Sequence, residues 1–413
     1  MRLSDFERSM LAGAQGEPRK LALEQQTAVG RFYDAADFVE VSQAHVMADG
    51  EAVGEAGVRL LERLAAAPPE HRRVLVPTVT DPRGVDPKAC AWLRQPEHAP
   101  ERERRIVEAF EAMGVLLTDT CLNYQVVLPP VKGEHLAFGD TGSTIYANSV
   151  QGARSNFEGG VAALWAALTG RVPRYGFHLD GVRRGTRLFE VTFRPSDLAD
   201  WGALGGVVGR RMASYWEVPV VTGVEASPTS DELKHFGAAL ASYGSTPMFH
   251  MVGVTPEAPD LATAFANPPP AAEPIARADL DAFYAGFREG EAKVDVVVFA
   301  APQLSLLELQ RLADLLDNRR VHPDVALLAA SPAEVVRAAE RMGIRGRIES
   351  AGGRLLEGVC FYQMYAREMG ELNGWRRLVT NSAKLTNIIA GYGFEPVLAP
   401  TEACIDAAVR GTL

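Results

Sequence analysis

Short apolar runs alternate with amphipathic stretches along most of the chain, which is the pattern of strands alternating with helices. Up to residue 120, helices are expected from about 6, from about 17, over 54–66 and over 100–113, and strands over 38–42, 73–80 and 114–117. Strand, loop, helix and strand in this order predict parallel β-strands covered by helices. The expected fold class is therefore α/β, built from parallel-sheet units.

The second half of the chain continues this alternation. Strands are expected over 187–194, 218–223, 294–301, 325–329 and 355–360, and helices over 197–215, 279–287, 306–316, 332–342 and 401–409. Residues 294–301 are almost continuously apolar, which is typical of a strand buried on both faces of a parallel sheet. Residues 267–276 (NPPPAAEPIA) are rich in proline and alanine and predict a linker. Three α/β regions are expected, over 1–135, 136–266 and 277–413.

Composition places the chain among ordinary globular proteins. Apolar residues make up 47% and charged residues 23% of 413 positions, a length that suits about two to three domains. A net charge of −10 argues against nucleic acid or an anionic membrane as the main partner. The first residues contain no apolar signal region, and no run reaches the ~18 apolar residues that a membrane-spanning helix needs. A cytoplasmic protein is expected.

The four cysteines are too few for a disulfide framework, and no CxxC pair is present. Cys121 and Cys360 each follow a predicted strand, at the position where a parallel sheet delivers residues to a ligand crevice. Thiolates at such positions suit zinc or an iron–sulfur cluster. Cys90 and Cys404 are expected to be structural. Cys121 and Cys360 are either metal ligands or buried small side chains.

The densest polar segment is the glycine-rich stretch GDTGSTIYANSVQGARSNFEGG over 139–160. Small residues allow the backbone to approach a ligand closely, and an arginine binds a carboxylate or phosphate through two parallel hydrogen bonds. One interpretation is a loop that holds a small acidic substrate, and the other is a solvated loop that leads into a helix near residue 159. The candidate substrate-binding residues are Asn148, Ser149, Arg154, Ser155 and Asn156.

A second polar cluster follows over 243–258, where an apolar strand carries His250 and the chain then turns at Glu257. Burial raises the pKa of a carboxyl group, so Glu257 in a cleft could act as a general acid or base. The alternative is a core histidine followed by a helix-capping carboxylate.

The segment LVTNSAK over 378–384 is expected to join a strand to a helix that begins near residue 383. Backbone N–H groups at the start of a helix attract anions, and Lys384 adds a positive charge there. The alternative is a helix-capping Ser382 followed by a lysine on the surface.

Several long motifs together resemble the large, catalytic subunit of aconitase X, a hydro-lyase branch of the aconitase superfamily. The motifs are YANSVQGARSNFEGG (146–160), GRVPRYGFH (170–178), DELKHFGAALASYGSTPMFHMVGVTPEA (231–258) and VTNSAK (379–384), with shorter matches at SQAH (42–45), VPTVT (76–80) and TCLNY (120–124). The resemblance covers nearly the whole chain. It implies aconitase-type catalytic domains that lack the small swivelling domain, so that a separate small subunit would be a partner.

The resemblance implies a dehydratase that acts on a small hydroxy carboxylic acid similar to cis-3-hydroxy-L-proline, at a site shared with the small subunit. Members of the family act on that compound or on mevalonate 5-phosphate. Iron, as an ion or as an iron–sulfur cluster held by cysteines, would act as a Lewis acid on the leaving hydroxyl. The implied residues are Lys384, Ser382 and Glu257 for catalysis, Asn148, Ser149, Arg154, Ser155, Asn156 and His45 for substrate binding, and Cys121 and Cys360 for the metal.

The chain departs from the family pattern at three places. It has TGST at 141–144 in place of an acidic Glu-Ser pair, and Gly358-Val359 in place of Asp-Thr. It has AAPQ at 300–303 in place of a Gly-Cys-Pro-His type of segment, so the third cysteine ligand of the archaeal type is absent at Ala301. Two other functions therefore stay open: an isomerase or biosynthetic lyase with altered chemistry, and a non-catalytic subunit that binds a ligand or supports a partner.

Overall fold

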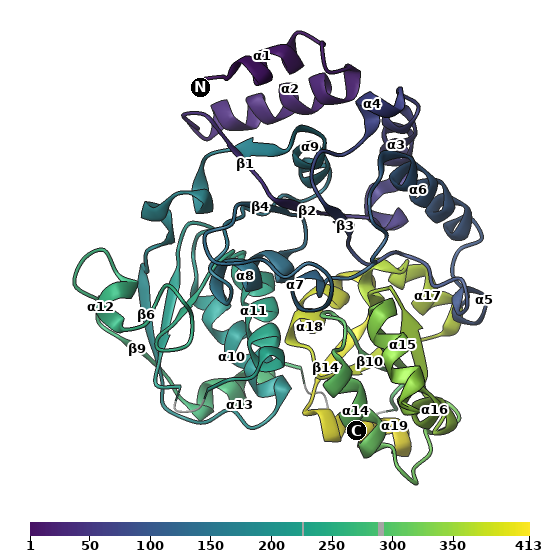
Figure 1. Cartoon of the computed structure of the whole chain (residues 1–413). Coiled ribbons are helices and arrows are strands. Elements are labelled where there is room, and N and C mark those ends of the chain that lie inside the picture. The colour runs from purple at the N-terminus through teal and green to yellow at the C-terminus, as the bar shows by residue number, and fades with distance from the viewer. Residues whose placement is uncertain (225–226, 288–292) are drawn as a thin grey trace.

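The computed structural model describes residues 1–224, 227–287 and 293–413 as three α/β regions (Figure 1). The first region forms the upper part of the view, the second the lower left and the third the lower right. Each region contains one parallel sheet, and the first also has a short antiparallel pair. The predicted α/β class is therefore confirmed. Among the described residues, none of the helices has the length and apolar character needed to cross a membrane.

The first region is built around a parallel sheet with the strand order β3-β2-β4. Helix α9 packs between this sheet and α2, while β1 pairs antiparallel with β5. The elements are α1 (Asp5–Leu11), α2 (Glu17–Phe32), β1 (Phe38–Glu40), β2 (Gln43–Val46), α3 (Gly50–Ala65), α4 (Pro69–Arg72), β3 (Thr78–Thr80), α5 (Cys90–Leu93), α6 (Ala99–Met113), α7 (Asn123–Val126), β4 (Leu136–Phe138), α8 (Thr141–Ser149), α9 (Ala162–Thr169), β5 (Arg171–Pro173), η1 (Gly176–His178) and η2 (Asp180–Arg183).

The second region has a parallel sheet with the order β8-β7-β6-β9 and a tightly packed pair of helices, α10 and α11. Its elements are β6 (Arg187–Val191), α10 (Leu198–Arg211), β7 (Pro219–Thr222), α11 (Ser230–Gly244), β8 (His250–Met251), α12 (Leu261–Ala264), β9 (Glu273–Ile275) and α13 (Arg277–Ala285).

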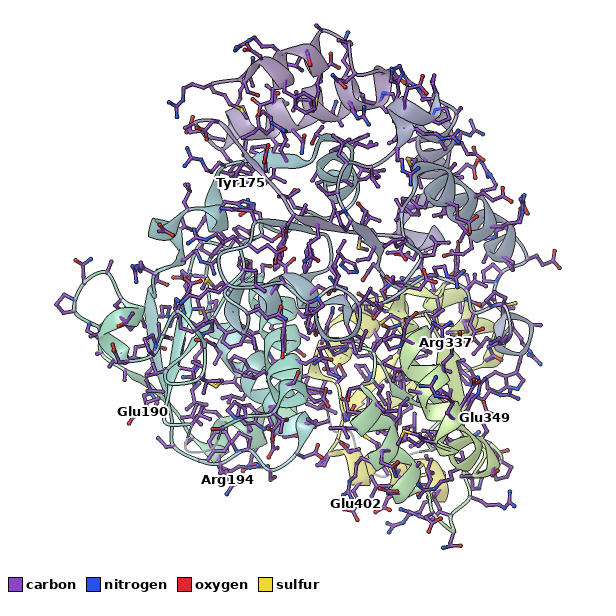
Figure 2. All side chains as sticks on the ribbon, viewed as in Figure 1. Tyr175, Glu190, Arg194, Arg337, Glu349 and Glu402 are labelled. Carbon is purple, nitrogen blue, oxygen red and sulfur yellow. The ribbon has the colours of Figure 1, made fainter. Side chains whose placement is uncertain are left out.

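The third region has a five-stranded parallel sheet with the order β12-β11-β10-β13-β14. Charged side chains such as Arg337 and Glu349 lie on outer helices of this region (Figure 2). Its elements are β10 (Val296–Phe299), α14 (Leu306–Leu315), β11 (Ala326–Ser331), α15 (Ala333–Arg341), α16 (Ile344–Ser350), β12 (Arg354–Glu357), η3 (Phe361–Gln363), α17 (Ala366–Asn373), β13 (Arg377–Thr380), α18 (Ala383–Ile389), η4 (Ala390–Tyr392), β14 (Glu395–Leu398) and α19 (Thr401–Arg410).

The structure differs from the expected boundaries at two places. Strand β4 lies beyond the boundary expected after residue 135, yet it pairs with β2 and completes the first sheet. The segment expected as a linker, 267–276, contributes β9 to the edge of the second sheet beside β6. A proline such as Pro274 is tolerated on an edge strand, because the outer side of that strand needs no N–H donor. Proline content therefore does not separate a linker from an edge strand here.

The solvated-loop interpretation of 139–160 is wrong for its first half. Residues 141–149 form helix α8, whose N-cap Asp140 accepts a hydrogen bond from the Ser143 N–H at 2.7 Å. Every residue from Gly142 to Ser149 is buried. A helix buried on all sides shows no amphipathic period, so the periodicity that predicts other helices is absent from its sequence.

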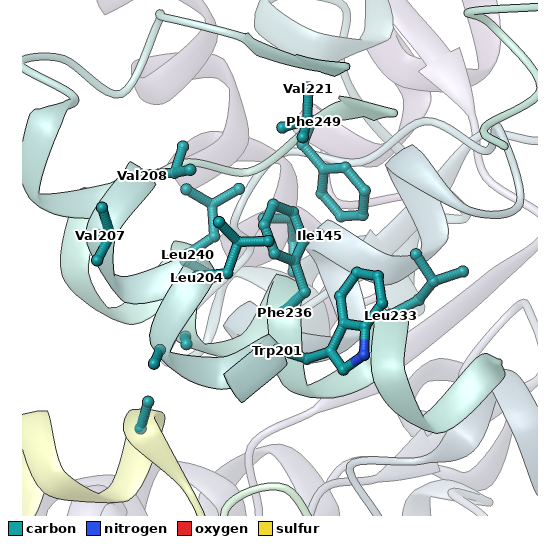
Figure 3. Close-up of a cluster of buried hydrophobic side chains, with 14 of the residues drawn as sticks. Ile145, Trp201, Leu204, Val207, Val208, Val221, Leu233, Phe236, Leu240 and Phe249 are labelled. Carbon is teal, nitrogen blue, oxygen red and sulfur yellow. The ribbon is translucent and has the colours of Figure 1, made fainter. Parts of the chain in front are cut away.

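The backbones of helices α10 and α11 approach each other closely. Large apolar side chains of the two helices, among them Trp201 and Leu204 of α10 and Phe236 of α11, belong to one buried cluster (Figure 3). A Cβ atom placed on Gly205 would lie 2.2 Å from the carbonyl oxygen of Phe236, and one on Gly209 would lie 3.0 Å from the nitrogen of Gly244. Glycine at these positions therefore sets the distance between the two helices.

We expect Gly205→Ala to lower the free energy of unfolding by about 2 kcal/mol, because backbone cannot move aside as a flexible side chain would. Gly346→Ala is the matched control: Gly346 also lies inside a helix, α16, but its added Cβ would meet nothing within 4 Å. That change should raise stability by about 0.5–1 kcal/mol through helix propensity. Urea unfolding followed by circular dichroism measures both, and equal effects would contradict the packing argument.

Candidate functional site

Buried polar residues gather where the carboxyl ends of strands from the first and third regions meet. His45 lies on β2, Asp81 follows β3 and Asp140 follows β4. Cys360 comes shortly after β12, and Lys384 lies on the first turn of α18, directly after β13. The carboxyl ends of parallel strands are the usual ligand position in open α/β sheets. This group of buried residues is called the carboxyl-end pocket below, a name that denotes these side chains.

The centre of the pocket is a buried ion pair. The Lys384 Nζ lies 3.2 Å from Asp140 Oδ1, and both side chains are about 95% buried (exposed fractions 4% and 5%). Burial works against the charged ammonium, but the Asp140 carboxylate raises the pKa of Lys384 above its ordinary value. Burial likewise opposes ionisation of Asp140, but the Lys384 ammonium and the Ser143 N–H lower its pKa below the ordinary value. Both groups therefore remain charged at neutral pH.

The pKa of a second carboxyl group in the pocket is shifted in the opposite direction. Burial and the nearby Asp140 carboxylate raise the pKa of Asp81 well above its usual range, which favours the neutral carboxylic acid. Its Oδ2 accepts a hydrogen bond from Gln363 Nε2 at 3.0 Å. Its Oδ1 has no hydrogen-bond partner in the described part of the chain and lies 3.5 Å from His45 Nε2. Two carboxyl groups whose pKa values are shifted apart are the arrangement that acid–base chemistry uses.

His45 is held in one tautomer. Its Nε2 lies 2.8 Å from the carbonyl oxygen of Thr120, which can only accept, so Nε2 carries the hydrogen. Burial lowers the pKa of His45 and keeps the ring neutral, which leaves a lone pair on Nδ1. That nitrogen is buried and has no partner among the described residues. His45 thus presents a hydrogen-bond acceptor.

The two cysteines face the same pocket as thiols. Burial raises the pKa of Cys121 well above its ordinary value and that of Cys360 to about 12. The nearby carboxyls of Asp81 and Asp140 act in the same direction, and the Lys384 ammonium acts against them. Lys384, His45, Cys121 and Cys360 were expected at the site, and the structure brings all four together.

The donor set does not fit a cluster held by three cysteines. The position of the third cysteine is Ala301, which is buried and has no donor side chain. Within residues 1–224, 227–287 and 293–413, no group of three or more histidine, cysteine, aspartate or glutamate side chains has an arrangement that could hold a metal ion. Cys121 and Cys360 supply only two sulfur atoms to this donor set.

The polar side chains of the 148–156 segment bind the backbone around them. Asn148 Nδ2 donates to the carbonyl oxygens of Ser155 and Pro247 at 2.8 and 2.9 Å, and its Oδ1 accepts from the Ser155 N–H. Ser149 Oγ accepts from the Phe249 N–H at 2.9 Å, and Asn156 Oδ1 accepts from the Phe177 N–H at 2.9 Å. These contacts hold the segment in shape.

The charged residues of that part of the chain are paired outside the carboxyl-end pocket. Arg154 donates to the His178 carbonyl at 3.1 Å and pairs with Asp180. Glu257 is neither a helix cap nor an isolated carboxyl, because both of its oxygens accept from the Arg183 guanidinium. 

The remaining alternatives left open by the sequence are also settled by contacts. His250 is a buried core histidine whose Nε2 donates to the Arg183 carbonyl at 2.7 Å. Ser382 caps α18, and its Oγ also donates to the Ala301 carbonyl at 2.5 Å. The interpretation of Lys384 as a surface lysine is wrong. Cys404 lies in the core of the third region, as expected, whereas Cys90 is half-exposed.

Sequence reasoning did not single out Asp81, Asp140 and Tyr362. Asp81 directly follows β3, and Asp140 lies two residues after the end of β4, so their positions at strand ends could have identified them. Lys384 Nζ lies 5.8 Å from the centre of the Tyr362 ring. Glu158 was also missed: its buried Oε1 has no hydrogen-bond partner in the described ranges. Burial alone raises the pKa of Glu158 to about 7 from 4.5.

This shift predicts how stability depends on pH. The folded chain binds a proton at Glu158 more tightly than the unfolded chain, so the free energy of unfolding falls as pH rises from about 4.5 through about 7. Glu158→Gln should remove roughly 2–3 kcal/mol of that fall, which makes the profile between pH 5 and pH 8 flatter than that of the wild type. Urea unfolding at several pH values measures it, and parallel profiles would show that Glu158 does not contribute.

Family models match nearly the whole chain. The model described as the aconitase X first domain matches residues 1–181, the second-domain model matches 185–285 and the third-domain model matches 294–410. The matched domains correspond to the three regions of the fold, with the first ending at 181 rather than 135.

Two named relatives are dehydratases. The cis-3-hydroxy-L-proline dehydratase of Pseudomonas aeruginosa is 34% identical over 417 residues, which cover 99% of this chain and 70% of that protein. The phosphomevalonate dehydratase large subunit of Methanothermobacter thermautotrophicus is 34% identical over 392 residues, 94% of each chain. The crystal structure of Thermococcus kodakaraensis aconitase X in its holo-form has a TM-score of 0.89, 27% identity, and coverage of 99% of this chain and 100% of that one. The predicted enzyme class, a hydro-lyase of the aconitase superfamily, is confirmed, and the chain belongs to the aconitase X family.

Proposed function

We propose that the chain dehydrates a small hydroxy carboxylic acid in the carboxyl-end pocket, together with a separate small subunit. The observation that carries the proposal is the buried Lys384–Asp140 ion pair beside the carboxyl of Asp81, whose pKa is raised well above its usual range. Loss of water needs a positive charge for the substrate carboxylate and a proton for the leaving hydroxyl. The pocket offers one group for each.

The substrate that this pocket favours is a compound like cis-3-hydroxy-L-proline. The relatives divide between that substrate and phosphomevalonate, and these differ strongly in charge. The Lys384 charge is balanced by Asp140, and the other pocket groups described above are neutral. A zwitterionic amino acid suits such a pocket, whereas a phosphate dianion calls for further cations.

In this reaction the carbon next to the carboxylate loses a proton, and the neighbouring carbon loses its hydroxyl. The Lys384 ammonium stabilises the negative charge that grows on the carboxylate as the proton leaves. Asp81 donates its proton to the hydroxyl, which departs as water. His45 Nδ1 accepts a hydrogen bond from the substrate. The base that removes the carbon-bound proton is assigned to the small subunit.

The other predicted site residues take positioning roles in this proposal. Asn148, Ser149, Ser155 and Asn156 shape the segment that follows α8, and Ser382 fixes the start of α18 on which Lys384 lies. Arg154 and Glu257 form ion pairs at the outer side of the same segment. The expected iron at Cys121 and Cys360 has no place in these steps, because the donor set lacks a third ligand.

A second candidate is an isomerase or biosynthetic lyase on a related acid. It is favoured by Ala301 and Gln303, which stand where the family pattern has cysteine and histidine. A chain that turns over another hydroxy acid, but neither compound named above, would support it. Binding measured by calorimetry without turnover, with the small subunit present, would instead indicate a non-catalytic subunit.

We expect the chain, purified together with the small subunit, to convert cis-3-hydroxy-L-proline and to leave mevalonate 5-phosphate unchanged. The physical reason is the balance of charge in the pocket. Mass spectrometry detects the loss of one water from either compound in parallel reactions. Preferential dehydration of mevalonate 5-phosphate would contradict the assignment of substrate class while leaving the dehydratase chemistry in place.

Lys384→Met should lower kcat/KM by roughly 10²–10³-fold, the typical effect of removing one group that stabilises a developing negative charge. The control is Lys88→Met, because Lys88 forms a surface ion pair with Glu357 and lies outside the pocket. Lys384→Met also leaves the buried Asp140 carboxylate unpaired, which lowers stability.

The double variant Lys384→Met with Asp140→Asn separates the two effects. Asparagine caps a helix as well as aspartate does, and it carries no charge, so the double variant should regain stability. Its activity should stay low. Recovery of activity together with stability would show that Lys384 acts only through the fold.

A further inference from the structure

Gln303 is hydrogen-bonded to all three domains. It lies between β10 and α14 and is fully buried. Its side-chain Nε2 donates to the carbonyl oxygens of Asp119 and Val359 at 3.2 and 3.1 Å, and its Oε1 accepts from the Cys121 N–H at 3.2 Å. Its own carbonyl oxygen accepts from Lys234 Nζ at 3.2 Å. Asp119 and Cys121 belong to the first domain, Lys234 to the second and Val359 to the third.

These contacts occupy all the hydrogen-bonding groups of the Gln303 side-chain amide. A glutamine side chain has two N–H donors and one carbonyl acceptor, and each of them has a partner in the protein. The backbone N–H of Gln303 is also used, since it donates to Cys121 Sγ at 3.4 Å. Gln303 therefore links parts of the protein rather than contacting a substrate.

The Gln303 side chain joins the two loops that carry the thiols. Asp119 lies two residues before Cys121, and Val359 directly precedes Cys360. The side-chain amide of Gln303 thus fixes the distance between the Cys121 loop and the Cys360 loop, because it is hydrogen-bonded to both. A metal bound by cysteines on these loops would supply the same kind of link.

Lys234, the second-domain residue that donates to the Gln303 carbonyl, is itself held by ion pairs. Lys234 is fully buried and pairs with Glu308 and, at 3.2 Å, with Asp231. Burial works against its charge, but these two carboxylates raise the pKa of Lys234 above the ordinary value. Glu308 also accepts a hydrogen bond from His235 at 2.8 Å, and burial is outweighed by the Lys234 ammonium and this hydrogen bond, which lower the pKa of Glu308 to about 2. The ammonium that binds the Gln303 carbonyl is therefore charged at neutral pH.

We propose that Gln303 is a positioning residue that joins the Cys121 and Cys360 loops by hydrogen bonds, so that this chain assembles its pocket without a metal cluster. Two observations support this assignment. Ala301 lacks the third sulfur, and every hydrogen-bonding group of the Gln303 side-chain amide has a partner in the protein. Cys121 and Cys360 then act as buried thiols that shape the pocket. The proposal concerns how the site is held together and does not depend on which reaction the site catalyses.

The first test uses the reactivity of the two thiols in the full-length chain. Gln303→Leu removes the side-chain hydrogen bonds to both loops, so alkylation of Cys121 and Cys360 by iodoacetamide should become at least 10-fold faster. Peptide mass spectrometry measures each cysteine separately.

The control is Gln95→Leu. Gln95 Nε2 donates to the carbonyl oxygens of Gly84 and Met364 at 2.7 and 2.9 Å, so it also links the first and third domains through two bonds. Its loss should lower the melting temperature without changing the reactivity of Cys121 and Cys360. Equal alkylation rates in Gln303→Leu and Gln95→Leu would overturn the positioning role.

The second test needs only the wild-type chain and therefore stands even if Gln303→Leu fails to fold. The protein is purified without oxygen, incubated with ferrous iron and sulfide, and desalted. We expect far less than one iron per chain and no visible absorption from a cluster. Stoichiometric iron that is lost in Cys121→Ser and Cys360→Ser would overturn the proposal, and dehydratase activity measured separately would then still test the function on its own.

Discussion

The site depends on one constraint: an ammonium and a carboxylate are buried together, and neither can remain charged there alone. Removing two charges from water carries a penalty of several kcal/mol for each ion, and their mutual attraction offsets it only when the geometry is held. The structure holds it from two sides. Asp140 is fixed as the N-cap of α8 after β4, and Lys384 lies on the first turn of α18 after β13. The sheets of two domains must therefore keep their relative position for the pair to exist.

The two aspartates of the pocket are both buried, yet their pKa values are shifted in opposite directions. Asp140 has the Lys384 ammonium and a backbone N–H, which outweigh burial, whereas Asp81 has a glutamine amide and the repulsion of Asp140. Their pKa values are therefore shifted in opposite directions, although both residues follow strands of one sheet, in which β2 lies between β3 and β4. The difference arises from what each one touches.

Much of the fold follows from the sequence, because a strand buried in a parallel sheet and an amphipathic helix leave clear local patterns. Strands such as β10, β11 and β13 were predicted for this reason. Helix α8 was not, because burial on all sides removes its period. The site residues likewise divide into those that a local sequence pattern identifies and those that depend on distant contacts. Cys121, Cys360 and Lys384 were placed at strand ends by local pattern, whereas the roles of Asn148 and Asn156 depend on backbone partners distant in sequence, such as Pro247 and Tyr175.

In the proposed reaction, the pairing of Lys384 with Asp140 also sets a condition on how the substrate carboxylate binds. A cation that is fully neutralised by its partner exerts a weak field on a substrate, whereas an unpaired buried cation would lose its proton. The pair therefore works best if the substrate carboxylate competes with Asp140 for the same ammonium. Because Asp140 also caps α8, it keeps the Ser143 N–H as a partner when the ammonium shifts toward the substrate. In the proposed reaction, this cap hydrogen bond lets Lys384 turn toward the substrate carboxylate without leaving Asp140 buried and unpaired.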